Sequence, residues 1–304
     1  MLNDFVLILS SIMTEGLIYG IMVIGVFITF RILNFPDLTV DGSFPLGAAV
    51  MAVFIVNGFD PIIALFISFI GGMLAGIITA IIHNKLKVPH LLAGIITMIM
   101  LYSVNLRVLG RPNMPLLKKE TLLSKMEILF EGILSREISQ LLLVIIIVLF
   151  IKILIDLFFQ TDLGLMIGAL GNNTQMIISQ GVNPEWLIII GVGLSNGLVA
   201  ISGAMAAQYF RFADANLGQG IIIAGLTSVM IGEFVLRSNN ISILTLRVII
   251  GSIIFRGIMY FGRFYGFYVG MKANDLKLVQ GLLIIILLIA TYIRKHPAKK
   301  RIKV

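Results

Sequence analysis

Long apolar segments dominate this sequence and decide what it can fold into. Nine apolar runs cover residues 5–32, 44–56, 61–82, 91–109, 141–159, 186–209, 221–236, 241–262 and 276–293. A helix needs about 20 mostly apolar residues to cross the roughly 30 Å of hydrocarbon in a bilayer. Of the 304 residues, 59% are hydrophobic and 12% charged, which is too much apolar surface for a water-soluble core. We therefore predict an all-α, polytopic membrane helix bundle of about nine membrane segments, a single transmembrane domain over residues 1–304.

The charge distribution bears on orientation. The net charge is +8, and six of the 23 Lys and Arg residues lie in the tail 294–304, directly after an apolar run. A basic tail in that position predicts a cytoplasmic C-terminus or, with the same geometry, an anchor on anionic lipid. Nine crossings then put the N-terminus and the stretch 111–137 outside, unless one short run is re-entrant. Basic residues that serve topology give no reason to expect nucleic acid, and the absence of Cys excludes a disulfide scaffold.

Two of the apolar runs, 44–56 and 221–236, are short for a full crossing. Each follows a polar approach that contains glycine, and the residues that mark these approaches are Pro36, Asp37, Asp41, Gly42, Asp214 and Gly218. Short membrane helices with broken entries are typical of transporters near their translocation pathway. The alternative is that packing tilts or shortens these two segments.

The two approaches belong to an internal repeat. An offset of 177 residues aligns residues 16–20 (GLIYG) with 193–197 (GLSNG), and residues 35–37 (FPD) with 212–214 (FAD). In the nine-segment arrangement the two copies cross the membrane in opposite directions, which makes them inverted repeats. Apolar segments also match by chance, so the sequence alone leaves this open.

Catalytic motifs are missing from the sequence. His83, His90 and His296 lie at or near the ends of apolar runs, and neither HExxH nor GxSxG occurs. No acidic residues are spaced for a metal site. The phosphate-binding pattern GxxxxGK[ST] is also absent. We therefore expect no enzyme activity, no metal and no cofactor on this chain; any ATP and Mg would be held by a partner.

Two classes of transport protein remain open for this sequence. An ion-coupled carrier or a channel could use Asp37, Asp41, Asp214 or Glu233, because coupling ions need carboxylates or unwound carbonyls in the membrane. The structural alternative is that Asp37 and Asp214 cap the short helices that follow them.

The second class is the membrane subunit of an ATP-driven importer, which needs a cytoplasmic loop that docks on an ATPase. Residues 161–183 are the candidate, since Asn172, Asn173 or Thr174 can cap a short helix that ends at Gly181. Apolar residues offered to a partner are Leu163, Leu165, Ile167 and Leu170. The alternative is an amphipathic loop on the membrane surface.

This loop resembles the ATPase-contacting loop of bacterial ATP-binding cassette (ABC) importer permeases of the branched-chain amino acid and ribose type. The matching residues are Thr161, Gly164, Ala169, Gly171, Asn173, Gly181, Val182 and Asn183. The chain departs from the pattern at Gly168, where the family commonly has Arg, and at Ile177, where it has Ala. The missing Arg puts a charged contact in doubt but leaves the helix and its apolar face.

The resemblance extends over nearly the whole chain. Residues 16–20 and 30–43, and residues 195–198 with Gln208 and Asp214, look like the subgroup paired with Trp- or Tyr-binding lipoproteins. This resemblance implies a permease in the bacterial cytoplasmic membrane that works with a second permease copy, ABC ATPases and an external binding lipoprotein. The implied substrate is a small polar solute, an amino acid, with aromatic ones the first to try.

Charges within the apolar runs are the last signal. A lone Arg in lipid costs a few kcal/mol or more, so Arg247 should pair with Glu233. Arg256 has no obvious local partner in the sequence. It either snorkels to the outer headgroups or faces the pathway or the binding protein.

Overall fold

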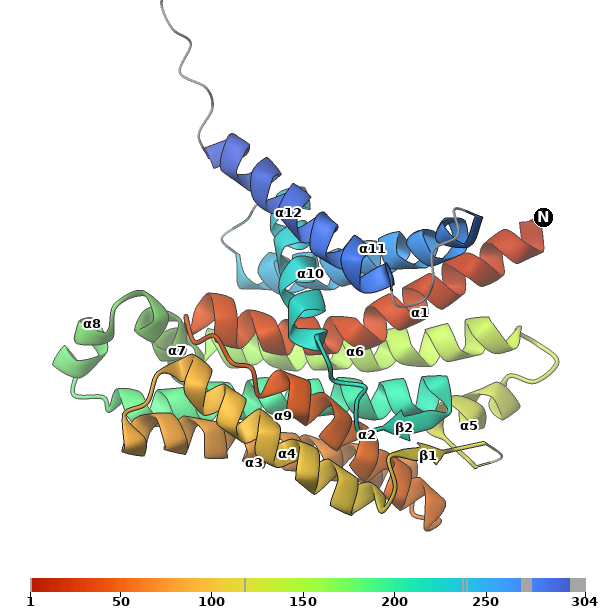
Figure 1. The fold of residues 1–304 in the computed structure, drawn as a ribbon, viewed down its shortest axis with the longest axis horizontal. Helices are drawn as coiled ribbons and strands as arrows, with labels where there is room; N and C mark the ends of the chain where they lie inside the picture. The colour runs from red at the N-terminus through yellow and green to blue at the C-terminus, as the bar shows by residue number, and fades with distance from the viewer. Residues whose placement is uncertain (1, 118, 237, 239, 269–274, 296–304) are drawn as a thin grey trace, which may run out of the picture.

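The computed structural model describes residues 2–117, 119–236, 238, 240–268 and 275–295 (Figure 1). The long and medium helices are α1 (Leu2–Phe27), α2 (Val40–Val56), α3 (Pro61–Leu86), α4 (His90–Leu109), α6 (Arg136–Gln160), α9 (Pro184–Phe210), α10 (Ile221–Val235), α11 (Ile241–Tyr268) and α12 (Leu276–Lys295). The smaller elements are the π-helical turn η1 (Ile28–Ile32), α5 (Leu122–Leu129), α7 (Asp162–Asn172), α8 (Thr174–Ser179) and the strands β1 (Asn113–Pro115) and β2 (Phe212–Asp214).

The helices confirm the predicted all-α membrane bundle. Six helices in the described part of the chain are long and apolar enough to span a bilayer, and three shorter apolar helices, within α2, α10 and α12, accompany them. The one addition is a two-stranded antiparallel ribbon in which Met114 of β1 lies opposite Ala213 of β2. Of the basic tail, residues 296–304 lie outside the described residues.

The bundle has two distinct ends. Figure 1 shows α7 and α8 at one end, and α5 with β1 and β2 at the other, where α1 also begins. Backbone contacts agree with this view, because a Cβ built on Gly171 of α7 would lie 1.9 Å from the carbonyl oxygen of Ile32, at the far end of α1 and η1. The α7–α8 pair is therefore separated from the β1–β2 ribbon by the length of the bundle.

Two central helices, α1 and α9, run antiparallel and hold the core. Ser195 Oγ donates to the carbonyl oxygen of Gly25 at 2.7 Å, and Ser202 Oγ donates to that of Ile18 at 2.8 Å. In the 177-residue offset, Ile18 corresponds to Ser195 and Gly25 corresponds to Ser202. Each of these two hydrogen bonds is therefore the repeat-related counterpart of the other. The two repeats thus meet across a local two-fold axis.

The glycine pairs of the repeat lie in matching places. Ideal Cβ atoms built on Gly16 and Gly20 of α1 would meet α11, at Ile253 and Ile249. Those built on Gly193 and Gly197 of α9 would meet α3 instead. Small residues four apart let helices approach closely. Because α3 and α11 occupy the same place in the two copies, the structure supports the inverted repeat.

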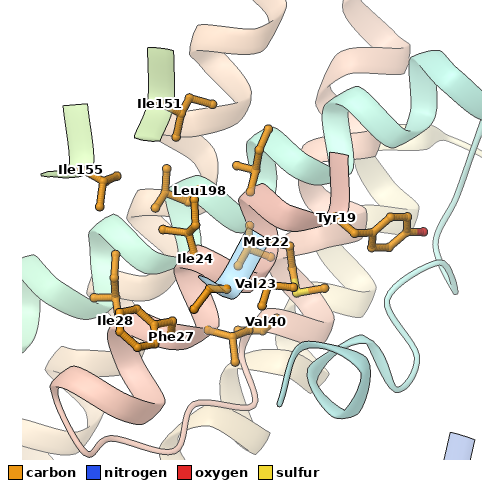
Figure 2. Packing of buried hydrophobic residues seen from close by; sticks show 14 of the residues in the cluster. Tyr19, Met22, Val23, Ile24, Phe27, Ile28, Val40, Ile151, Ile155 and Leu198 are labelled. Atoms are coloured by element: carbon orange, nitrogen blue, oxygen red, sulfur yellow. The ribbon is translucent and has the colours of Figure 1, made fainter. Parts of the chain in front are cut away.

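Aliphatic side chains fill the space around α1. Figure 2 shows Met22, Ile24 and Phe27 of α1 packed beside Leu198 of α9 and Ile151 of α6. Ile24 is fully buried and Phe27 is 2% exposed. The α1–α9 pair is therefore enclosed by its neighbours, while outer helices such as α3 and α6 expose apolar side chains, as lipid contact requires.

Both repeats interrupt the helix at the same point. After η1 the chain is non-helical and ends in a turn at Leu38 and Thr39 before α2 begins at Val40. Figure 1 shows this segment running back along the bundle, so that α2 starts partway along it. After α9 the chain passes through Arg211 in the left-handed region and β2 before α10 begins at Ile221. The two short segments are therefore shortened helices of 17 and 15 residues with irregular entries, as the sequence predicts.

The close approach of α2 and α9 gives a test of this packing. A Cβ on Gly203 would lie 1.9 Å from the carbonyl oxygen of Phe44, whereas one on Gly168 meets nothing within 4 Å. We expect Gly203→Ala to destabilise the protein by about 1–3 kcal/mol through overpacking, and Gly168→Ala to be neutral or slightly stabilising. Thermal unfolding of the detergent-solubilised protein measures both. Equal midpoints for the two variants would contradict the packing described.

Candidate translocation and coupling sites

The two helix breaks meet through Asp41. Its side chain, in the first turn of α2, accepts hydrogen bonds from the backbone N–H groups of Gly220 (to Oδ2, 3.0 Å) and Ile222 (to Oδ1, 2.9 Å). A Cβ on Gly218 would lie 1.8 Å from the carbonyl oxygen of Asp41, so this approach requires glycine. The first repeat therefore caps the short helix of the second.

This cross-repeat cap corrects the interpretation of Asp214 as a helix cap. The N-cap of α10 is Gly220, and Asp214 Oδ1 accepts from the backbone N–H of Asn216 at 2.7 Å, inside the preceding turn. The contact that caps α10 joins residues 179 positions apart. Local spacing could not reveal it.

Asp37 ties the first break to α9. The residue is 1% exposed. Its Oδ1 accepts from the backbone N–H of Thr39 at 2.9 Å, and its Oδ2 accepts from Asn196 Nδ2 at 2.7 Å. Ser43 Oγ donates to Asn196 Oδ1 at 2.7 Å, so both the oxygen and the nitrogen of the Asn196 amide are hydrogen-bonded. Asp37 is therefore not the N-cap residue of α2, which is Thr39, but a buried acceptor that fixes the extended entry.

The remaining residues of the first break also have structural roles. A Cβ on Gly42 would lie 2.9 Å from the Cβ of Leu101, so glycine lets α2 pack on α4. Pro36 lies half-buried in the extended entry. The described residues contain no group of three His, Asp or Glu side chains that could hold a metal ion. The carboxylates considered as ion ligands are thus engaged with protein donors.

The charges within the apolar runs are paired. Arg247 Nη2 lies 3.1 Å from Glu233 Oε1, which confirms that predicted pair, and Arg31 Nε adds a second partner at 2.7 Å from the same oxygen. Arg256, which has no obvious local partner in the sequence, pairs with a residue 241 positions away. Its Nη1 lies 2.8 Å from Glu15 Oε1.

Arg256 also lies over an aromatic ring. Its guanidinium carbon is 3.3 Å from the ring centroid of Tyr19. Glu15, the acidic residue of the first apolar run, is the signal that could have revealed the ion pair. A second pair, Lys152 with Asp156, was also missed, and Asp156 Oδ1 accepts from Thr245 Oγ1 at 2.6 Å.

Three residues of the loop 161–183 are helix caps. The side chain of Thr161 accepts from the backbone N–H of Gly164 at 3.3 Å and starts α7. Asn173 accepts from Met176 N–H at 3.2 Å and starts α8, so it is the cap among the three candidates named above. Asn183 accepts from Glu185 N–H at 2.9 Å and starts α9. The spacing of these residues therefore sets where the chain turns.

The small residues of this loop pack against the chain itself. A Cβ on Gly164 would lie 2.3 Å from the carbonyl oxygen of Phe158, and one on Gly171 would meet η1 as described above. Gly181 has φ +78°, a conformation that favours glycine. Ala169 is partly buried against the core. These residues shape the loop; they do not themselves form its outer face.

The exposed apolar residues of the loop differ in part from the expected ones. Ile167 and Leu170 are 0% and 6% exposed, so they serve the chain's own core and are not available to a partner. Leu163 and Leu165 of α7 are exposed, as expected, and Met176 and Ile178 of α8 join them. The exposed apolar residues of this end are therefore Leu163, Leu165, Met176 and Ile178, and we call the surface of α7 and α8 that carries them the α7–α8 face.

Comparison with known proteins gives the family. Residues 8–290 match the model of the branched-chain amino acid transport system permease component. The chain is 39% identical over 275 residues to a tyrosine transport system permease protein of Clostridioides difficile (strain R20291), covering 90% of this chain and 88% of the relative. It is 33% identical over 281 residues to an uncharacterized protein, RP368, of Rickettsia prowazekii (strain Madrid E), covering 92% and 96%. No solved structure was found to match.

The fold and these matches define a multi-pass membrane permease. The chain belongs to the branched-chain amino acid transport system permease family and is the permease component of an ABC importer. Permeases of such systems are transport subunits that act with a partner ATPase and a substrate-binding protein.

The cross-repeat cap makes a prediction about stability. Asp41→Ala removes the acceptor for two backbone N–H groups of α10, and loss of a cap costs about 0.5–2 kcal/mol. We expect this variant to unfold at a lower temperature in detergent than Asp214→Ala, whose carboxylate bonds only within its own turn and to Asn113, with Asp41→Asn between the two. Equal unfolding midpoints for Asp41→Ala and Asp214→Ala would refute the cap.

Proposed function

We propose that two copies of this chain form the translocation pathway of a bacterial ABC importer for an amino acid, with aromatic amino acids the first candidates. In this proposal ABC ATPases bind ATP and Mg and dock on the α7–α8 face. An external binding lipoprotein delivers the substrate at the opposite end. The chain itself catalyses no reaction and lies in the cytoplasmic membrane with its C-terminus in the cytoplasm.

The observation that carries the proposal is the α7–α8 face. Its four apolar side chains are 47–55% exposed on two capped helices that lie at one end of the bundle (Figure 1). Exposed apolar side chains on helices beyond the spans favour a protein partner or lipid headgroups. A docked ATPase would cover them, and α7 would transmit its movement to η1 through the close contact at Gly171.

The orientation follows from the same assignment. If the α7–α8 face is cytoplasmic, then α5 and the β1–β2 ribbon face outward, where a binding protein arrives. In this orientation α2 and α10, with their irregular entries, each count as one membrane crossing. The chain then crosses the membrane nine times, and its C-terminal tail lies in the cytoplasm. ATP binding would shift the equilibrium between outward-open and inward-open states. The helices would change their relative orientation at the two breaks that Asp41 joins.

The substrate class rests on the relatives. The relative from Clostridioides difficile is described as a tyrosine transport permease, and it shares 39% of aligned residues with this chain. That similarity supports an aromatic amino acid. The ion-coupled carrier is less well supported, because Asp37 and Asp41 are engaged with protein donors.

Charges placed on the α7–α8 face test the docking. Leu163→Glu and Met176→Glu should keep normal amounts of permease in the membrane while reducing ATPase co-purification at least tenfold, because an apolar interface does not accept a buried charge. The matched control is Leu117→Glu, an equally drastic change at a 71% exposed position near α5. Normal ATPase recovery with both α7–α8 variants would remove the assignment.

Reconstitution separates the two transport classes. We expect liposomes that contain this chain alone to take up no more tyrosine than empty liposomes, with or without a proton or sodium gradient. Uptake should begin only when the ATPase, ATP and the loaded binding protein are added. Gradient-driven uptake by the lone chain would favour the ion-coupled carrier instead.

A further inference from the structure

A basic pocket of about 470 Å³ lies between η1, α7 and the start of α11. Figure 1 shows that α11 begins at the same end of the bundle as α7. The volume falls within the roughly 300–1,000 Å³ typical of small-molecule sites. Arg31 and Arg247 lie on the pocket wall with the polar residues Asn172 and Ser238, and no acidic residue lines it in the described part of the chain.

The positive charge of this pocket is only partly compensated. Glu233 Oε1 lies 2.7 Å from Arg31 Nε and 3.1 Å from Arg247 Nη2. One carboxylate cannot neutralise two guanidinium groups, so the cluster keeps a positive charge. The Arg31 side chain is 57% exposed, and its terminal nitrogens have no hydrogen-bond partner among the described residues. Arg31 therefore offers an accessible fork of N–H donors to a ligand in the pocket.

The rest of the pocket wall is mainly apolar. Two of the helices around the pocket, α6 and α11, meet where Thr245 Oγ1 donates to Asp156 Oδ1 at 2.6 Å. Leu157 and Leu246, which directly follow these residues, are 56% and 41% exposed, as contact with lipid requires. The pocket therefore adjoins helices that face lipid. Its apolar lining residues are Phe27, Ile32, Phe159, Leu165, Ile241 and Leu244.

An anion with an apolar part matches both halves of this pocket. A guanidinium fork fits the oxygens of a phosphate group, and basic pockets between membrane helices on the cytoplasmic side bind lipid headgroups. A free phosphate ion would leave the apolar wall without a contact. From this geometry we propose that the pocket binds the phosphate group of an anionic phospholipid, with Arg31 as the principal contact and the acyl chains along α6 and α11.

A bound headgroup would act on the helix that we assign to ATPase docking. Gly164, Gly168 and Asn172 of α7 line the pocket together with Arg31 and Ile32 of η1, so an occupied pocket bridges α7 and η1. The inference goes beyond the proposed function, because it makes anionic lipid a ligand of the permease itself. It depends neither on the substrate nor on a docked ATPase.

Cysteine protection tests the lipid site, since the chain has no Cys of its own. Gly168 lines the pocket, and a Cβ there meets nothing within 4 Å, so Gly168→Cys should fold and react with iodoacetamide, which is uncharged. In the detergent-solubilised full chain, we expect saturating dioctanoyl-phosphatidylglycerol to slow this reaction at least fivefold. Dioctanoyl-phosphatidylcholine, which has the same acyl chains but no net charge, and inorganic phosphate should each leave the rate within twofold. Gln180→Cys, exposed at the end of α8, is the unprotected control.

Variants of Arg31 identify the contact. In the Gly168→Cys background, Arg31→Gln should abolish the protection, and Arg31→Lys, which keeps the charge, should retain a weaker protection. Glu233 keeps Arg247 as its partner in both variants, so the bundle should still fold. Arg111→Gln, an exposed arginine next to β1 at the other end of the bundle, is the matched control and should keep full protection.

Several results would overturn the lipid site. Equal protection by dioctanoyl-phosphatidylcholine would show an apolar groove that ignores charge, and protection by inorganic phosphate would show a site for a free anion. An unreactive Gly168→Cys would show that the pocket is closed, and full protection in Arg31→Gln would remove Arg31 as the contact. If phosphatidylglycerol gives no protection and Arg31→Gln lowers ATPase co-purification, the charge serves the ATPase interface instead, and the importer assignment stands.

Discussion

The structure depends on how two interrupted helices satisfy their backbone inside a membrane. The hydrocarbon core supplies no water, so the N–H groups at the start of a shortened membrane helix must find protein acceptors. Asp41 supplies them for α10, and Asp37 holds the extended entry to α2 through Thr39 and Asn196. Each acid links one repeat to the other. The helix breaks, which would otherwise weaken the bundle, are therefore the places where the two repeats are hydrogen-bonded to each other; we call the Asp41 contact the Asp41 joint.

The antiparallel pair α1 and α9 gives that joint a fixed frame. Two serine hydroxyls donate to backbone carbonyls across the pair, related by the repeat, and a shift of either helix would break both bonds together. The coupling that we propose depends on such a frame, because a movement of α7 would have to reach the breaks through tightly packed helices. The Gly171 contact joins α7 to the end of α1 and η1, and α1 in turn lies against α9. Close contacts therefore link α7 to η1 and α1 to α9, and α9 packs closely on α2, the helix that carries Asp41.

The sequence predicted what depends on short-range pattern and missed what depends on long-range contact. Apolar run length located the membrane helices, and the order of Thr161, Asn173 and Asn183 located three helix starts, because a cap acts within three residues. The partner of Arg256 is 241 residues away, and the two partners of Asp41 are 179 and 181 residues away. The inner role of Ile167 and Leu170 was equally hidden, since an apolar residue on a short helix can face the core or a partner with the same spacing.

The location of the ATPases on the assembled transporter is the measurement that tests this account most directly. Electron cryo-microscopy of the permease with its ATPases would show which end of the bundle they cover. The account predicts ATPase density on Leu163, Leu165, Met176 and Ile178, with the β1–β2 ribbon at the opposite, uncovered end. ATPases bound at the end that carries α5 and the ribbon would contradict both the orientation and the coupling path from α7 to Asp41.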